Sequence, residues 1–281
     1  MQMLLNTPHE IIQQNILGAA AKAKTRILNI LVLGMMAGAF IAMGAQSSSL
    51  AVHNISNVGL ARTLAGCIFP VGLMMIVFVG GELFTGDCMM SMAWMQRKIH
   101  FADMLRTLVL VYVSNFVGAA LIAFLVAHSG QYDYSSGVLG AYTIKVAYGK
   151  VHLSFANALV SGILCNILVC VAVLMAAAAK DIAGKVLAIF FPILAFVVSG
   201  FEHCVANMYY IPAGIFASKN AAYATKALEL YNIDSTQLSS LNWGSFAISN
   251  LIPVTIGNII GGALLVGGAC FYLHGKALHE S

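Results

Sequence analysis

The stretch VLAIFFPILAFVVSGFEHCVANMYYIPAGIFAS, residues 186–218, is uncharged except for Glu202. A helix needs about 20 residues with few or no charges to cross the roughly 30 Å hydrocarbon core of a bilayer. Similar uncharged stretches recur on both sides of this one, and together they predict an all-α polytopic membrane protein. The six predicted spans lie near residues 27–50, 63–81, 107–128, 154–179, 186–218 and 247–273.

The composition excludes several other classes of protein. Of 281 residues, 60% are hydrophobic and 9% are charged, whereas soluble domains carry about 25% charged residues. The 14 Lys and Arg against 10 Asp and Glu are too few for the clustered basic face of a nucleic-acid-binding protein. The six cysteines lie mostly in apolar runs without paired ligand spacing. We therefore expect no nucleic acid, disulfide, metal or cofactor.

The distribution of Lys and Arg predicts the orientation in the membrane. Six spans place both termini on one side, which receives nine of these residues against five on the other, and the positive side is cytoplasmic. We expect a cytoplasmic amphipathic segment at 1–24, a six-helix membrane domain at 25–275 and a cytoplasmic tail at 276–281.

The N-terminal segment lacks the cationic start and continuous apolar stretch of a signal peptide. Instead it begins like a helix, because Thr7 can act as the N-cap, Pro8 takes the first helical position and Glu10 completes a capping box. We expect a short helix on the cytoplasmic face of the membrane, with an apolar side formed by Ile12, Ile16 and Ala20.

An internal repeat relates the two halves of the chain. The third span contains SNFVGAAL at 114–121 and the sixth contains GNIIGGAL at 257–264. Each half has three spans, an odd number, so the second half must be inverted across the membrane relative to the first. The sequence predicts two inverted three-helix repeats.

The second span of each half contains a helix-breaking motif. The first motif is GGELFTG at 80–86 and the second is SGFEH at 199–203. Unwound backbone is tolerated at membrane depth only where it is buried in protein or lines a cavity. Interrupted segments at corresponding places in two repeats indicate a transporter's binding site, so helices two and five are predicted to be broken around the pathway.

Few side chains near these breaks could carry chemistry. His203 is the one histidine inside a span beside a break. The sequence offers no second ligand with which it could hold haem or a metal ion, so it must transfer protons or bind anions. Thr85 offers a hydroxyl at the other break. Glu82 and Glu202 are expected to hold the loose backbone N–H groups, and Glu202 also to orient the imidazole. The apolar side chains around them are Phe69, Leu73, Leu83, Phe84, Val169 and Phe196.

Five motifs closely resemble the formate/nitrite transporter family, whose members carry small monovalent anions across bacterial and protist membranes. The resemblance covers roughly residues 25–275 and implies an aquaporin-like protomer in a homopentamer, with a separate pore through each subunit. The motifs are GELFTG at 81–86, KVH at 150–152, NILV at 166–169, GFEHCVANM at 200–208 and NLIPVTIGNIIGG at 250–262.

The resemblance also implies roles for individual residues. His203 matches the family's central histidine, Thr85 its loop threonine and Lys150 its vestibule lysine, while the N-terminal segment resembles its proposed cytoplasmic gate. Asn166 and Asn258 match polar residues near the pore centre. Two hydrophobic constrictions map onto Phe69, Phe196 and Val169 on the outer side and onto Leu73 and Leu83 on the inner side. Leu153 departs from the formate channels, which often have a second histidine there.

These features predict a channel, not an enzyme, and the resemblance implies formate, nitrite or hydrosulfide as its substrate and the bacterial inner membrane as its location. Lys150, alone in a long outer loop, is expected to attract the anion. His203 and Thr85 then bind it between the constrictions, with protonation or hydrogen bonding by the histidine left open. A proton-coupled secondary transporter of the same anions shares every feature. A membrane enzyme would need a nucleophile–base pair or a motif such as H-E-x-x-H.

Overall fold

A computed structural model describes residues 5–275 of the chain, and the tail predicted at 276–281 lies outside this range. In the described part, the only strand-like pairing is an isolated bridge between Leu5 and Ala179. Six helices are long and apolar enough to cross a membrane, which confirms the predicted number of spans. They are Ile27–Val52, Val58–Val79, Phe101–Ala127, Phe155–Ala178, Ile182–Ser199 and Trp243–Gly275.

The helices follow the same order in both halves of the chain. The first half contains α1 (Pro8–Lys22), α2 (Ile27–Val52), α3 (Val58–Ile68), α4 (Val71–Val79), α5 (Phe84–Asp87), η1 (Cys88–Met90), α6 (Ser91–Met95), α7 (Phe101–Ala127) and η2 (Gln131–Asp133). The second contains α8 (Val138–Val151), α9 (Phe155–Ala178), α10 (Ile182–Ser199), α11 (Cys204–Ala217), α12 (Ala221–Tyr231), α13 (Ser235–Ser239), α14 (Trp243–Ser245), η3 (Phe246–Leu251), α15 (Ile252–Ile259), η4 (Ile260–Val266), α16 (Gly267–Cys270) and η5 (Phe271–Gly275).

Helix α1 begins as its sequence predicts. The Thr7 side chain accepts a hydrogen bond from the backbone N–H of Glu10, and the Glu10 side chain accepts one from the backbone of Thr7, which completes the capping box. Ile12 and Ile16 are buried. The apolar side of α1 therefore packs onto the molecule.

Both broken spans are present, and glycine makes each break possible. Gly80 ends α4 with φ 101°, and Gly200 ends α10 with φ 72°, a region of backbone conformation that side chains with a Cβ rarely adopt. The chain is extended until the helix resumes at Phe84 in one repeat and at Cys204 in the other. The fifth span predicted at 186–218 consists of α10 and the 14-residue α11, and their separation at the second break confirms that this helix is broken.

The repeats also share their closest helix crossings. A Cβ atom on Gly38 of α2 would lie 2.0 Å from the backbone oxygen of Asn115 in α7, and one on Gly257 of α15 would lie 2.2 Å from that of Leu159 in α9. Only glycine permits such an approach between backbones. The first and third spans of each repeat are therefore in direct backbone contact.

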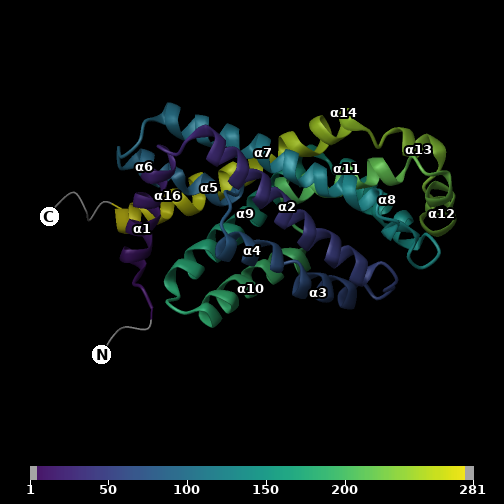
Figure 1. Ribbon diagram of the computed structural model, residues 1–281, viewed down its shortest axis with the longest axis horizontal. Coiled ribbons are helices and arrows are strands. Elements are labelled where there is room, and N and C mark those ends of the chain that lie inside the picture. The colour runs from purple at the N-terminus through teal and green to yellow at the C-terminus, as the bar shows by residue number, and fades with distance from the viewer. Residues whose placement is uncertain (1–4, 276–281) are drawn as a thin grey trace.

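The segments outside the spans gather at opposite ends of the molecule. Helices α1 and α6 lie at one end, and α8, α12 and α13 lie at the other (Figure 1). The first and last described helical segments, α1 and η5, are in contact, as an even number of spans requires. The assignment of this end to the cytoplasm stays a prediction.

Candidate functional site

The first break is held by an asparagine of α7. The Asn115 Oδ1 atom accepts a hydrogen bond from the backbone N–H of Phe84 at 2.9 Å, where the helix resumes. Its amide nitrogen donates to the backbone oxygens of Glu82 and Gly34, both at 2.8 Å. One buried side chain thus satisfies a backbone N–H and a backbone oxygen of the break and connects the break to α2.

The second break has the same arrangement. The Asn258 Oδ1 atom accepts from the backbone N–H of Cys204 at 2.9 Å. Its amide nitrogen donates to the backbone oxygens of Glu202 at 3.1 Å and Gly162 at 2.8 Å. The two asparagines are those that the repeat aligns, so the inverted symmetry extends to individual hydrogen bonds.

The glutamates have a different role from the one predicted, because their carboxylates face lysines and not the loose backbone amides. In the first repeat, Glu82 and Asp87 both form ion pairs with Lys22, the last residue of α1. In the second, the Glu202 carboxylate lies 2.8 Å from the ammonium of Lys150, the penultimate residue of α8. The helix that precedes each repeat therefore reaches the glutamate of the break that follows it.

The prediction that Lys150 lies alone in a long outer loop is therefore wrong, because Lys150 lies in α8 and is paired with Glu202. Its partner Glu202 also accepts a hydrogen bond from the amide of Asn207 at 2.7 Å. The carboxylate is fully engaged by these groups. In the hydrogen bonds of the described residues it makes none to the imidazole, so its predicted role in orienting His203 is wrong.

His203 and Thr85 meet at the centre of the protein, as predicted from the two breaks. The Nε2 atom of His203 lies 2.9 Å from the Oγ1 atom of Thr85, and both residues are buried. The Nδ1 atom accepts a hydrogen bond from the backbone N–H of Ala206 at 3.0 Å and so caps α11. A neutral ring that accepts at Nδ1 carries its proton on Nε2. The imidazole N–H is therefore directed at the threonine hydroxyl.

Two aromatic rings close the space beside His203. The centroids of Phe69 and Phe196 lie 5.4 Å apart in an edge-to-face arrangement, and the Phe196 ring lies 6.0 Å from the imidazole. All three residues line the same cavity. The remaining constriction residues predicted from the resemblance are buried but do not line this cavity: Leu73, Leu83 and Val169.

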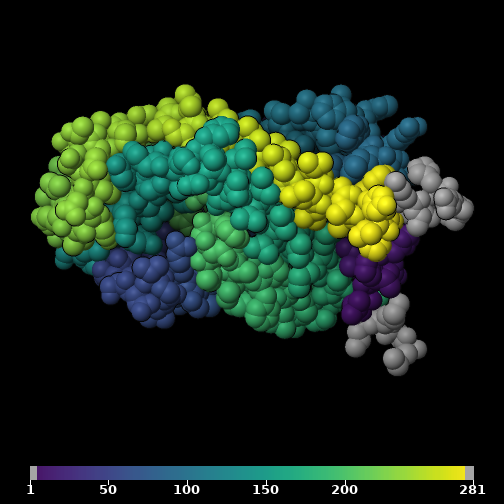
Figure 2. Space-filling model, turned by 180° about the vertical axis from the view of Figure 1, so that it is seen from behind, coloured from purple at the N-terminus to yellow at the C-terminus, as the bar shows by residue number. Residues whose placement is uncertain are grey.

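A funnel leads from the α8 end of the molecule to these rings. An outer cavity of about 830 Å³ adjoins an inner cavity of about 230 Å³, and both are lined by Arg62, Tyr142 and Lys150. Figure 2 shows this face hollowed between the segments that contain α3, in blue, and α8, in teal. The inner cavity ends at Phe69, Phe196 and His203. The funnel gives solvent a route to the outer side of the aromatic pair.

The two predicted pathway asparagines lie at the centre but are engaged with backbone. The amide of Asn166 donates to the backbone oxygens of Thr85 at 3.1 Å and Asn258 at 2.6 Å. Both asparagines are fully buried and neither lines the funnel. They support the centre of the fold, and direct contact with a permeating anion stays a prediction.

Several features near the site have no strong sequence signal. Tyr210, Ser48 and Asn207 line the inner cavity, yet in the sequence they are ordinary residues of apolar helices. Arg62 gives a better signal, because it is the charge that separates two uncharged stretches at 27–61 and 63–81. Among the described residues there is no group of His, Cys, Asp and Glu that could hold a metal ion.

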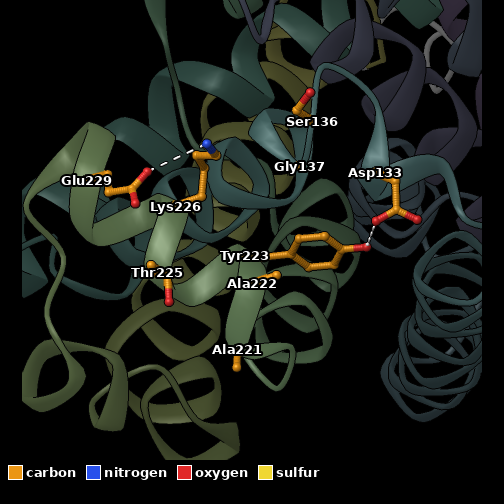
Figure 3. Close-up of a pocket in the computed structure, with 9 residues that line it drawn as sticks. All are labelled: Asp133, Ser136, Gly137, Ala221, Ala222, Tyr223, Thr225, Lys226 and Glu229. Atoms are coloured by element: carbon orange, nitrogen blue, oxygen red, sulfur yellow. Dashed lines mark hydrogen bonds and ion pairs between the residues drawn. The ribbon is translucent and has the colours of Figure 1, made fainter.

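A separate surface hollow lies near the α8 end, between η2 and α12. Figure 3 shows the Tyr223 hydroxyl bonded to Asp133 and the Lys226 ammonium directed at Glu229. The hollow shares no lining residue with the funnel. We therefore assign the candidate site to the funnel and the His203–Thr85 pair.

Two broken spans that meet at a buried polar pair, below an open funnel, define a membrane transport protein. The formate/nitrite transporter family model matches residues 9–272, and the chain belongs to this family. As a member of a transporter family with six apolar helices, it is a multi-pass membrane protein.

Comparisons with individual proteins agree with this assignment. The chain is 38% identical to the uncharacterized transporter YrhG of Bacillus subtilis, with 98% of this chain and 96% of the relative covered. It is 37% identical to the formate channel FocA of Haemophilus influenzae, with coverages of 89% and 88%. A solved pentameric formate channel with formate bound superposes with a TM-score of 0.77 at 31% identity, covering 88% of this chain and 97% of that one. The likeness supports an anion channel.

Proposed function

We propose that the protein is a channel for small monovalent weak-acid anions, namely formate, nitrite or hydrosulfide, in the bacterial inner membrane. The formate channel among its relatives and the formate-bound structural neighbour support this substrate class. The same neighbour is pentameric, which supports a homopentamer here. The termini and segment 1–24 are assigned to the cytoplasm by the Lys and Arg count. The observation that carries the proposal is the funnel that ends on Phe69, Phe196 and the His203–Thr85 pair.

The aromatic pair explains why weak acids would be selected. Even after relaxation, moving an ion into a dry, low-dielectric space costs several kcal/mol. Phe69 and Phe196 are 3% and 4% exposed, so a bare anion meets this cost at the constriction. The anion of a weak acid avoids it by taking up a proton as the surroundings become less polar, whereas chloride cannot.

The cap on α11 supports one of the two roles considered for His203. Proton donation by the imidazole would require Nδ1 to be protonated first, but Nδ1 already accepts the N–H of Ala206. A hydrogen bond from Nε2–H needs no such change, since this N–H already faces Thr85. His203 therefore acts as a neutral hydrogen-bond donor, and the substrate anion takes its proton from hydronium of the bulk solution, relayed through water in the funnel.

The test compares His203→Asn and His203→Phe with the wild-type channel in proteoliposomes. Flux of formate, nitrite, hydrosulfide and lactate is measured in one preparation at several pH values. Asparagine can replace the cap and the hydrogen bond, so we expect His203→Asn to retain the pH profile at a reduced rate and His203→Phe to abolish flux. Loss of the pH dependence in His203→Asn would instead assign proton donation to the histidine.

The same preparation distinguishes a channel from a proton-coupled carrier. Single-channel currents support a continuous pore, whereas obligatory and saturable proton symport supports the carrier. Wild-type protein that transports none of the four anions would refute the proposed substrate class.

A further inference from the structure

We propose that the inner cavity is an oxyanion-binding station, where the Tyr210 hydroxyl and the Lys150 ammonium hold the substrate before it reaches the aromatic pair. The station selects oxyanions such as formate and nitrite over hydrosulfide. This inference rests on the proposed function and narrows its substrate class.

The Tyr210 hydroxyl is held near the cavity with its proton available. The Oγ atom of Ser48 lies 3.5 Å from this hydroxyl, beyond the 2.5–3.0 Å of a normal O–H···O bond, and Ser49 is a second hydroxyl neighbour. Ser48 uses its own proton for the backbone oxygen of Ala45 at 2.8 Å. Tyr210 lines the inner cavity, so its O–H can donate to a guest without breaking a strong bond.

Lys150 places a second donor beside the same ring. Its ammonium lies 5.2 Å from the centroid of the Tyr210 ring and donates one hydrogen bond to Glu202. A lysine ammonium has three donors, so two remain for other partners. An oxyanion in this cavity can therefore receive hydrogen bonds from the Lys150 ammonium as well as from the Tyr210 hydroxyl.

The wall of the same cavity also contains a polar amide. The Oδ1 atom of Asn207 is buried and has no hydrogen-bond partner, although Asn207 lines the cavity. Leaving such a group unpaired is costly. An oxyanion matches the Tyr210 and Lys150 donors, because its charged oxygens are strong hydrogen-bond acceptors. Hydrosulfide matches poorly, since sulfur is a weak acceptor and S–H a weak donor.

The size of the cavity fits a partly hydrated substrate. The inner cavity of about 230 Å³ corresponds to roughly eight water molecules at about 30 Å³ each. A small anion can thus enter with several waters and exchange others for the side-chain donors. The station is therefore a step of partial dehydration before the dry constriction.

The test is Tyr210→Phe, which removes one oxygen and keeps the ring. Concentration dependence of formate, nitrite and hydrosulfide flux is measured in proteoliposomes beside wild-type protein. We expect KM for formate and nitrite to rise about tenfold, the equivalent of about 1.4 kcal/mol, and KM for hydrosulfide to change less than about twofold. Tyr223→Phe, in the separate surface hollow, is the matched control and should leave all three fluxes unchanged.

Each remaining outcome has a defined meaning. Equal changes for all three anions would show a structural effect and overturn the station, as would unchanged KM values for formate and nitrite. Wild-type protein that carries hydrosulfide but neither oxyanion would also overturn the station, whereas wild-type protein that carries none of the three anions would overturn the proposed function itself. Wild-type transport with an unaffected Tyr210→Phe variant would overturn only the present inference.

Discussion

Removing the side chain that holds a break should destabilise the whole fold. In Asn258→Ala, the backbone N–H of Cys204 and the backbone oxygen of Glu202 lose their partner, together with a bond to Gly162. Gly162 lies inside α9 and keeps its helical bond, so two groups are left unsatisfied. Each costs about 1–3 kcal/mol when buried. The expected loss is therefore about 2–6 kcal/mol.

The inverted repeat supplies an internal replicate. Asn115→Ala removes the corresponding bonds to Phe84, Glu82 and Gly34, so its loss should fall in the same range. The control is Asn157→Ala on α9, because the Asn157 side chain is exposed. Such surface changes usually stay within about 0.5 kcal/mol.

The assay is thermal unfolding of the detergent-solubilised protein, followed by tryptophan fluorescence at a fixed heating rate. At about 2–4 °C per kcal/mol for chains of 150–250 residues, both break variants should unfold at least about 4 °C below wild-type protein. Asn157→Ala should unfold with the wild type. If either break variant unfolded at the same temperature as the wild type, its asparagine would not be the residue that holds the break.

Three further predictions concern the lysines and the N-terminal helix. Lys150→Ala should reduce flux most at low ionic strength, where screening is weak, and should cost about 3–5 kcal/mol because Glu202 stays buried without its cation; adding Glu202→Gln should recover part of that stability, as thermal unfolding would reveal. Deleting residues 1–20 should leave the assembly intact by size-exclusion chromatography but alter flux or its pH response; identical transport at every pH would leave α1 only an anchoring role. Burial acts to lower the pKa of Lys22, but the Asp87 and Glu82 carboxylates outweigh it and raise that pKa above its ordinary 10.5. A group whose pKa is raised on folding contributes its full stabilisation at any pH below its pKa in the unfolded chain, and loses it only as the pH rises above its pKa in the folded protein. Ionisation of Lys22 should therefore not change the protection of α1 from proteolysis between about pH 6 and 9. Lys22→Gln should expose α1 to proteolysis over this whole range.

Features encoded locally could be predicted from the sequence. The spans follow from gaps between charges, α1 from a capping box within four residues, and the breaks from glycine beside glutamate. His203 and Thr85 were paired because inverted repeats bring corresponding breaks together. These predictions needed no knowledge of which helices pack side by side.

Features that depend on packing could not be predicted in this way. Lys150 and Glu202 are 52 residues apart, and nothing local indicates that a charge in one segment will neutralise one in another. The asparagines of the repeat were visible, but an asparagine in an apolar helix gives no sign of the backbone groups that it will satisfy. Tyr210 and Ser48 belong to helices that meet only in the folded protein.

The lysine that ends α1 contacts Glu82, and the lysine near the end of α8 contacts Glu202. The repeating unit is therefore four helices long, since it includes the helix that precedes the three spans. Duplication of a gene for one such unit would produce this chain, provided that the ancestral protein inserted into the membrane in both orientations and paired with its own inverted copy. Fusion of the two copies would fix one orientation for each, and each half would then be free to specialise its leading helix for the compartment that it faces.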